Sequence, residues 1–274
     1  VSSQELSLVL PEEKILMIHA TPVMRGDNTD GAVLVFHDIT ELKRLELIRR
    51  DFVANVSHEL RTPLSTIKGY AETLLDGAID DKEHAADFMK IIYDDANRLA
   101  LLVNDILDLS KIESGNFNLN MQETDIKPLI QHVVSGLQKK AEDKGIEVSV
   151  HVPDSIPTVQ ADESRLAQVL LNLIDNAIKY TQEGGAVRIE VLEKHDALLV
   201  DVADNGMGIP EQYLPRLFER FYRVDKGRSR KLGGTGLGLS IVKHIVQAHG
   251  GNVFVQSVVG QGATFSFTIP KSSR

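Results

Sequence analysis

The first 39 residues alternate apolar and polar positions in three short runs: LSLVL, KILMIHATPV and GAVLVFHDI. A period of two is typical of β-strands, whose successive side chains point to opposite faces. The stretch RGDNTDG between the second and third runs is rich in turn formers, which predicts an antiparallel hairpin. Because three strands seldom form an independent domain, we expect residues 1–39 to be the C-terminal part of a larger one.

From Thr40 the hydrophobic period becomes three or four residues, which predicts helices. The first helix is expected to run to about Leu75, and its coiled-coil-like seam begins with Leu42, Leu45, Ile48, Phe52 and Val56. After the turn DGAIDD, a second helix is expected over about residues 83–113. Two long helices joined by a short turn form a hairpin. Its apolar surface is too wide for one hairpin to hide, so we expect residues 40–115 to dimerise into a four-helix bundle.

From about Asn116 strands and helices interleave. Helical patterns near 126–143, 163–180 and 237–248 alternate with the strand-like runs IEVSVHV, AVRIEVLE, ALLVDVAD, GNVFVQSV and ATFSFTIP. This order predicts an α/β sandwich over residues 116–274, with helices on one face of a mixed sheet. The expected fold class of the whole chain is therefore α+β.

Composition narrows the classes of function. Acidic residues outnumber basic ones by 39 to 30 among 274 residues, and the net charge of −9 argues against nucleic acid as a partner. The chain has no cysteine, which excludes disulfides and thiolate metal sites. The sequence contains no run of about 18 apolar residues, so no membrane span is predicted, and no signal peptide is evident. Because the chain starts at Val1 without a methionine, we expect it to be a fragment.

The stretch SHELRTPL, residues 57–64, combines a histidine, a glutamate and a proline within one predicted helix. At 100° per residue, Asn55, His58 and Thr62 share the solvent face and Glu59 lies on its shoulder. The opposite stripe, expected to be buried, contains Phe52, Val56, Leu60, Leu64 and Ile67.

A neutral imidazole is a good nucleophile at physiological pH, and a neighbouring carboxylate can fix its tautomer. His58 and Glu59 therefore form a candidate nucleophile and base. Pro63 removes one backbone donor and is expected to bend the helix. Two plainer readings remain: an exposed histidine is usually an ordinary surface residue, and Pro63 can serve packing alone.

SHELRTPL resembles the H-box of bacterial sensor histidine kinases of two-component systems, and RRDFVANVSHELRTPLSTIKGYAETLLDGA is similar to kinases of the PhoR and WalK type. The resemblance implies that His58 accepts a phosphoryl group from ATP and that Glu59 is the base that orients it. It also implies that Thr62 places a water for dephosphorylation of the partner response regulator.

The stretch NLIDNAIKY, residues 172–180, suits phosphates and magnesium. Its polar residues Asn172, Asn176 and Lys179 lie on one helix face, opposite an apolar back of Leu166, Leu170, Leu173 and Ala177. Mg²⁺ prefers oxygen ligands and keeps several waters and substrate phosphates, so one amide oxygen from the protein is enough. The alternative is a merely solvated helix face.

Two glycine clusters follow. In DNGMGI, after a strand, Asp204 can accept from an exocyclic amine such as that of adenine, and Gly206 and Gly208 allow the backbone to approach a flat ring. GGTGLGLS precedes a helix, where backbone amides cradle phosphates. Its candidate residues are Gly234, Thr235, Gly236, Leu237 and Gly238. Surface turns also use glycine, so each cluster alone is a weak signal.

The stretch PEQYLPRLFERFYRVDKGRSRKLGG between the clusters is long and basic near its end, and it is expected to form a mobile lid. Its cations Arg223, Arg228, Arg230 and Lys231 are placed to meet phosphates, although a basic loop is more often solvated.

Together these segments resemble the Bergerat ATP-binding fold, with NLIDNAIKY as N-box, DNGMGI as G1, LFERFYR as F-box and GGTGLGLS as G2. The resemblance implies that Asn176 holds Mg²⁺, that Lys179 and Tyr180 flank the nucleotide, that Asp204 binds adenine and that Arg223 contacts the γ-phosphate. It covers residues 40–270, and the strands before it resemble the closing half of a PAS domain.

The expected function is that of an ATP-dependent protein-histidine kinase that passes its phosphoryl group to a response-regulator aspartate and also dephosphorylates that regulator. The expected cofactors are ATP and Mg²⁺, and the expected partners are a second copy of the chain and a receiver domain. We expect a cytoplasmic fragment of a protein of the bacterial cell membrane. The alternatives are a clamp ATPase related to gyrase and a non-catalytic dimeric scaffold.

Overall fold

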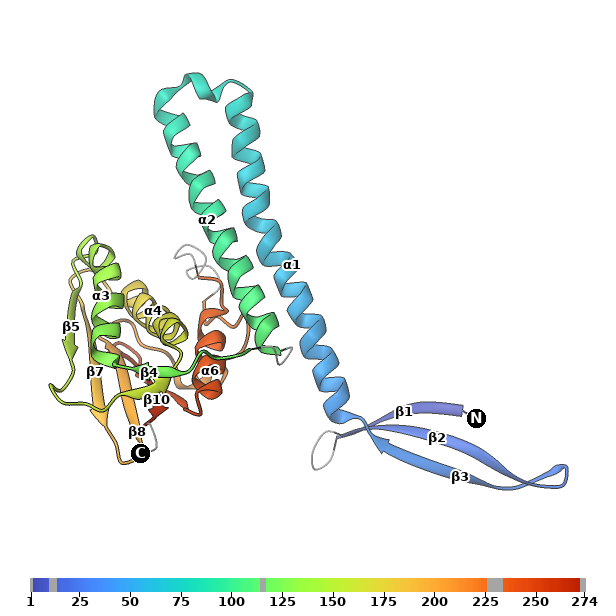
Figure 1. Cartoon of the computed structure of the whole chain (residues 1–274). Helices are drawn as coiled ribbons and strands as arrows, with labels where there is room; N and C mark the ends of the chain where they lie inside the picture. Colours follow the sequence, from blue (N-terminus) through green and yellow to red (C-terminus); the bar gives the residue numbers. More distant parts are fainter. Residues whose placement is uncertain (1, 10–13, 114–116, 226–233, 272–274) are drawn as a thin grey trace. The chain divides into compact units, whose positions relative to one another are not determined.

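The computed structural model describes residues 2–9, 14–113, 117–225 and 234–271 (Figure 1). The chain divides into two compact units, residues 1–61 and 62–274, and the division falls within helix α1, Thr40–Leu75. The elements confirm the α+β class, because N-terminal strands and long helices precede an α/β sandwich. Among the described residues, no helix is both long enough and apolar enough to cross a bilayer.

The N-terminal unit begins with a three-stranded antiparallel sheet of order β1-β2-β3, formed by Ser2–Leu8, Lys14–Arg25 and Asn28–Asp38. The predicted hairpin between the second and third runs is confirmed. Its turn is confined to Gly26 and Asp27, because Gly26 adopts a φ of 66° that lets the chain reverse within two residues.

Both faces of this sheet are open. Four consecutive residues of β3 point alternately to its two faces, yet each is 52–56% exposed: Val33, Leu34, Val35 and Phe36. The three strands therefore build no core of their own among the described residues. Their assignment to the end of a PAS-like domain stays a prediction.

The start of α1 is fixed by Thr40. Its amide lies 3.0 Å from Asp38 Oδ1, and its hydroxyl accepts from the amide of Ile15 at 2.9 Å. The amide of Ile39 donates to the carbonyl of Ile15 at 2.8 Å, and the Ile39 side chain is buried at the junction. These contacts within the N-terminal unit explain why α1 begins at Thr40.

The second unit contains the end of α1 and the whole of α2, Lys82–Glu113. The two helices are joined through a short 3-10 turn, η1, Ala78–Asp80, and the predicted bounds of about 40–75 and 83–113 are confirmed to within one residue. The rings of Tyr70 and Phe88 lie 5.0 Å apart near the turn, where the helices pack together.

The sandwich is built on a five-stranded sheet of order β5-β7-β8-β10-β9. Its strands are Glu147–His151, Ala186–Glu193, Ala197–Asp204, Gly262–Pro270 and Val253–Val258, in that spatial order. The β5–β7 pair is parallel and the other pairs are antiparallel, so the sheet is mixed as predicted. A separate two-stranded sheet, β4 (Gln122–Thr124) with β6 (Val159–Ala161), was not predicted.

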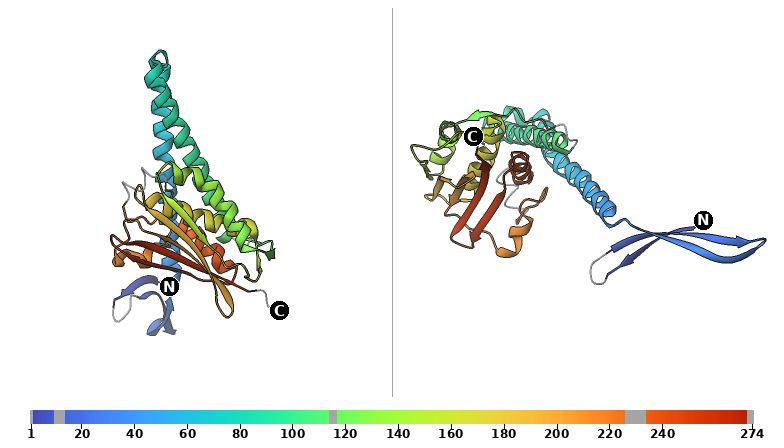
Figure 2. Two further views of the ribbon diagram at one scale, coloured as in Figure 1. Left: turned by 90° about the vertical axis from the view of Figure 1, so that its left-hand side faces the viewer. Right: turned by 60° about the horizontal axis from the view of Figure 1, so that its bottom comes forward.

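Three helices cover one face of the large sheet (Figure 2). They are α3, Ile126–Glu142, α4, Glu163–Tyr180, and α6, Gly238–Ala248. Alternate residues of the strands are buried beneath them, among them Val187, Ile189, Val200, Val202 and Phe267. This core holds the C-terminal end of α4 beside the turn after β8, and the middle of α4 beside the start of α6.

Candidate functional site: a histidine helix and a nucleotide-binding face

The histidine motif lies on α1 as predicted. His58, Asn55 and Thr62 are exposed and Glu59 is half-buried. The helix continues through Pro63, which is buried. The exposed imidazole is therefore accessible to an incoming reactant within the described part of the chain, whereas the bend expected at Pro63 stays a prediction.

The apolar stripe of α1 is buried only in part. Phe52, Val56, Leu60 and Ile67 are half-buried, but Leu64 is 59% exposed, so its predicted burial is wrong for the single chain. The physical reason is that one partner helix covers only one side of an apolar stripe. Three residues of the predicted seam of α1 are also exposed, namely Leu42, Leu45 and Ile48, and so are Leu101 and Leu107 of α2.

Helix α4 has the polar front and apolar back that were predicted. Asn172, Asn176 and Lys179 are half-buried, and the amide of Asn172 donates to the carbonyl of Gln168 at 2.9 Å. The residues of the back are almost fully buried: Leu166, Leu170, Leu173 and Ala177. The orientation of α4 is thus set by its core side, and the amides and the ammonium face away from the core.

A carboxylate that sequence reasoning missed positions the ammonium of Lys179. Asp175 Oδ2 lies 2.6 Å from Lys179 Nζ, and its Oδ1 accepts from Lys140 on α3. Burial opposes ionisation of Asp175, but the two ammonium groups outweigh it and hold its pKa below the ordinary value. Asp175 is therefore an anion between two cations.

The C-terminus of α4 is also held by Lys144, which sequence reasoning missed. Lys144 Nζ donates to the carbonyls of Ile178, Lys179 and Thr181 at 2.8, 2.8 and 2.6 Å. A cation at a helix C-terminus satisfies carbonyls that have no partner in the helix and interacts favourably with the dipole. The contact fixes the turn that carries Tyr180, which is half-buried.

Asp204, the last residue of β8, lies beside this helix end. Its Oδ1 accepts from the amides of Gly206 at 2.8 Å and Ala263 at 3.3 Å. Burial raises the pKa of Asp204, while the two amide bonds act in the opposite direction. Within the described part of the chain both bonds go to Oδ1, so Oδ2 is left to accept from a ligand.

The glycines after Asp204 have a packing reason that the sequence did not reveal. A Cβ on Gly206 would lie 2.6 Å from the Tyr180 carbonyl oxygen, so this turn presses against the end of α4. Gly208 has a φ of 67°, and a Cβ there would lie 2.1 Å from the Val258 carbonyl oxygen at the β9–β10 turn. These contacts require glycine at both positions, and their close approach to a flat ring stays a prediction.

The start of α6 meets both α4 and the segment after η2, Glu211–Arg216. A Cβ on Gly238 would lie 2.6 Å from Asn172 Oδ1, and one on Gly236 would lie 3.1 Å from Arg223 Nε. The carbonyl of Gly236 also accepts from the amide of Phe221 at 2.8 Å. The structure therefore brings the predicted N-box, F-box and G2 segments together, and Gly234 and Leu237 belong to the G2 segment that precedes α6.

Two aspartates of α2 contact the surface formed by α4 and the segment before α6, and sequence reasoning missed both. Asp105 Oδ2 accepts from the hydroxyl of Thr235 at 2.8 Å. Asp108 lies 3.0 Å from Arg165 Nη1 and accepts from the amide of Gln168 at 2.8 Å. The only available signal was their spacing of three residues, which places both on one helix face but occurs equally on solvated helices.

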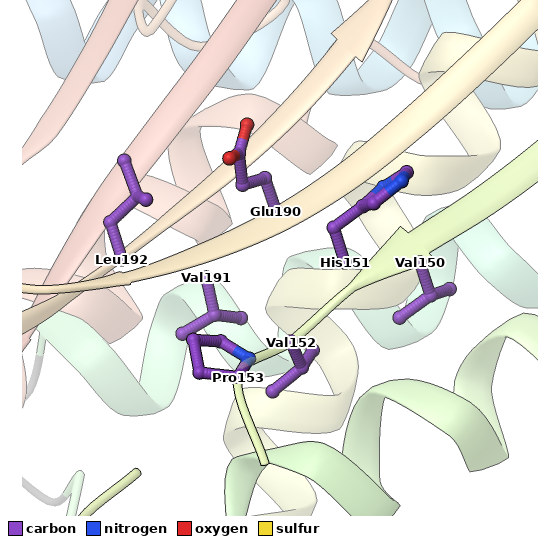
Figure 3. Close-up of a pocket in the computed structure, with 7 residues that line it drawn as sticks. All are labelled: Val150, His151, Val152, Pro153, Glu190, Val191 and Leu192. Carbon is purple, nitrogen blue, oxygen red and sulfur yellow. The ribbon is translucent and has the colours of Figure 1, made fainter. Parts of the chain in front are cut away.

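The cations Arg228, Arg230 and Lys231 of the predicted lid lie outside the described residues, so the lid stays a prediction. A shallow pocket of about 390 Å³ lies elsewhere, between the ends of β5 and β7 (Figure 3). It is lined by residues 150–153 and 190–192, none of which was predicted to bind nucleotide.

Two family models match the chain. Residues 161–273 match the histidine kinase-, DNA gyrase B- and HSP90-like ATPase, and residues 48–115 match the His Kinase A (phospho-acceptor) domain. The first segment holds the α4, β8 and α6 contacts, and the second contains His58. The chain is 43% identical to the sensor histidine kinase WalK of Bacillus subtilis over 275 residues, which cover 97% of this chain. The chain belongs to the sensor histidine kinases.

This sensor histidine kinase spans 45% of the length of the Bacillus subtilis relative. Solved structures of the family are similar along most of the chain. Histidine kinase ThkA in complex with response regulator protein TrrA matches with a TM-score of 0.67 and 26% identity, covering 98% of this chain and 79% of that one. Full-length ShkA in complex with AMPPNP matches with a TM-score of 0.62 and 33% identity, covering 82% of this chain and 46% of that one.

Proposed function

We propose that the chain is an ATP-dependent protein-histidine kinase that phosphorylates its own His58 and passes the phosphoryl group to an aspartate of a response regulator. One observation carries the proposal: an exposed imidazole lies within the segment that matches a phospho-acceptor domain, and the same chain carries the matching ATPase fold. A clamp ATPase has no use for such a histidine.

In the proposed reaction, a lone pair of the neutral His58 imidazole attacks the γ-phosphorus of ATP. A nitrogen–phosphorus bond forms while the bond to the bridging oxygen breaks, and ADP leaves with that electron pair. Glu59 accepts the proton of the other ring nitrogen. The protein contributes positioning and charge neutralisation more than covalent chemistry.

The nucleotide is proposed to lie against the front of α4. Asp204 Oδ2 would accept from the adenine amine, and Lys179 and Arg223 would offset phosphate charge. Backbone amides at the start of α6 would meet the phosphates, as is common at helix N-termini. The remaining proposed contacts are Asn172, Tyr180, Gly206, Gly208, Gly234, Thr235, Gly236, Leu237 and Gly238.

The donor set of α4 fits Mg²⁺. Asn176 supplies a hard amide oxygen on the half-buried polar face, and Mg²⁺ bound with a nucleotide needs few protein ligands beyond the phosphates and waters. Asn176 would hold the ion, which would neutralise phosphate charge. No cluster of three or more histidine, cysteine or carboxylate ligands occurs among the described residues.

The proposed partners are a second copy of the chain and a receiver domain. The exposed apolar residues of α1 and α2 support association through the hairpin. Thr62, one helical turn after His58, supports a second role in placing water for dephosphorylation of the receiver. The net charge of −9 gives no support to nucleic acid as a partner. We place this part of the protein in the cytoplasm, with a parent in the bacterial membrane.

Incubation of the purified chain with γ-³²P-ATP and Mg²⁺ tests the function. The chain should incorporate label that is labile in acid and stable in base, and His58→Gln should abolish incorporation while ADP binding is unchanged. Asn97→Gln on α2, an exposed polar residue in neither proposed site, is the control and should label as the parent does. Labelling of His58→Gln at the parental rate would overturn the assignment.

A further inference from the structure

Helix α2 places a carboxylate against the turn that is proposed to hold the phosphates. The hydroxyl of Thr235, within GGTGLGLS, donates to Asp105 Oδ2 at 2.8 Å and accepts from the amide of Leu237 at 3.2 Å. A threonine hydroxyl has one proton to donate. While Thr235 is bonded to Asp105, that proton is therefore not available to a phosphate oxygen.

Asp105 also acts on the ammonium group of the nucleotide face. Burial raises the pKa of Asp105, whereas the bond from Thr235 and the charge of Lys179 act in the opposite direction. Lys179 is thus close enough for its charge to be felt by Asp105 as well as by Asp175, which it contacts at 2.6 Å. The charge of Asp108, one turn along α2, also raises the pKa of Asp105.

Further bonds between α2 and α4 lie beside the bond of Asp105 with Thr235. Asp108 bonds to Arg165 and to Gln168 on α4, at 3.0 and 2.8 Å. The Arg165 guanidinium also lies 5.1 Å from the centre of the Phe117 ring. A partly buried, multiply bonded carboxylate is held more firmly than a surface ion pair. These bonds keep α2 against the face, and Asp105 is thereby held at Thr235.

We infer that Asp105 is a tethered anion that competes with the nucleotide phosphates for Thr235 and Lys179, so that it lowers nucleotide affinity whenever α2 lies on this face. The inference rests on the proposed function, because it takes the α4–α6 face as the phosphate site. A carboxylate and a phosphate repel each other in this half-buried setting, and they seek the same donors.

Competition of this kind is reciprocal. If α2 contact lowers nucleotide affinity by some factor, nucleotide weakens α2 contact by the same factor. Nucleotide binding then releases α2 from the ATPase face, which couples occupancy of the site to freedom of the hairpin. Asp105 is a positioning residue in this scheme and takes no part in the chemical step.

Calorimetric titration with Mg²⁺–ADP and Mg²⁺–AMP-PNP tests the inference. Asp105→Asn keeps the side-chain shape and removes the charge, and it should tighten binding about tenfold. The gain should be larger for AMP-PNP, which carries the additional phosphate. Asp94→Asn, an exposed aspartate on the same helix, is the matched control and should bind as the parent does.

The outcomes separate the two proposals. If the parent binds nucleotide and Asp105→Asn has the same or a lower affinity, the inference is overturned and the proposed function stands. Absence of binding in both chains overturns both. A merely structural role for Asp105 would lower the melting temperature without tightening binding, and that result also counts against competition.

A double-mutant cycle tests whether Asp105 acts through Thr235. Thr235→Val removes the hydroxyl while keeping the branched shape. The gain in affinity from Asp105→Asn should shrink in the Thr235→Val background, because one of the two contested groups is then gone. An undiminished gain would show that the Thr235 hydroxyl is not contested.

Discussion

The amide nitrogen of Asp162 lies 3.0 Å from Nε2 of His249, a residue 87 positions further along the chain. The other ring nitrogen, Nδ1, lies 2.8 Å from the carbonyl of Ile245, so Nδ1 carries the proton and the ring is neutral. Asp162 also caps α4 by accepting from the amide of Arg165 at 3.1 Å. One buried imidazole thus joins the end of α6 to the start of α4, the two helices that carry the proposed phosphate and magnesium contacts.

Replacing His249 should therefore destabilise the ATPase fold. His249→Phe leaves the Asp162 amide without its buried acceptor, which costs about 1–3 kcal/mol, whereas the Ile245 carbonyl keeps its bond from the backbone amide of residue 249. Urea unfolding followed by circular dichroism measures the loss. His195→Phe, in the exposed β7–β8 turn, is the control, and equal stability of the two variants would contradict the role of His249.

Asp204→Asn should separate stability from binding. Burial raises the folded-state pKa of Asp204 above the ordinary 3.8, so its contribution to stability is fully present below pH 3.8 and is lost as pH rises through the folded-state pKa. An asparagine does not titrate. The free energy of unfolding of the parent, relative to Asp204→Asn, should therefore fall as the pH rises from below 3.8 through the folded-state pKa of Asp204.

The same variant should bind nucleotide about tenfold more weakly or worse, because it loses a charged acceptor for the adenine amine. Calorimetry with ADP measures this loss. Asp196→Asn, an exposed aspartate in the β7–β8 turn, is the matched control. Parental affinity in Asp204→Asn would remove Asp204 from the adenine site.

Two glycine-to-alanine changes should have different consequences, because one should weaken ADP binding and the other should stabilise the fold. A Cβ on Gly238 would lie 2.6 Å from Asn172 Oδ1, so Gly238→Ala must displace that amide and should weaken ADP binding about tenfold. Gly136 lies within α3 with no atom within 4 Å of an added Cβ, so Gly136→Ala should raise the free energy of unfolding by about 0.5–1 kcal/mol. Calorimetry and urea unfolding of both variants check the pair, and the same response in both would contradict the packing at Gly238.

Leu64→Glu should weaken self-association. Leu64 is exposed in the single chain although it belongs to the apolar stripe of α1, and a buried leucine contributes about 1.5–3 kcal/mol. Sedimentation equilibrium should show a dissociation constant raised about tenfold or more. Ser65→Glu, on the exposed side of the same turn, should change it little, and equal effects would place the interface elsewhere.

The sequence predicted the long elements well because periodicity reports which face of an element is buried. Helix α1 was expected from Thr40 to Leu75 and strand β8 over residues 197–204, and both bounds are confirmed. The strands β4 and β6 were missed because three residues are too few to show alternation. The burial of Leu64 was predicted wrongly because a helical wheel does not say how many partners a helix has.

The candidate site divides in the same way. Motifs pointed to Asn172, Asp204 and Gly238, and the structure brings their segments together. The contacts of Asp105 with Thr235 and of Asp162 with His249 join residues 130 and 87 positions apart. Such pairs depend on how helices dock, and no local spacing along the chain encodes that.

The ammonium of Lys144 is shared by three carbonyls at the end of α4. If the last turn of that helix unravels, the carbonyls move away and the ammonium loses its hydrogen bonds. Fraying is therefore unfavourable at this helix end, where helices usually fray most readily. Backbone amides near Tyr180 should accordingly exchange with deuterium as slowly as those of the helix middle. The end of α4 would then be a rigid part of the proposed nucleotide site, and conformational change on binding would occur in the segments opposite it.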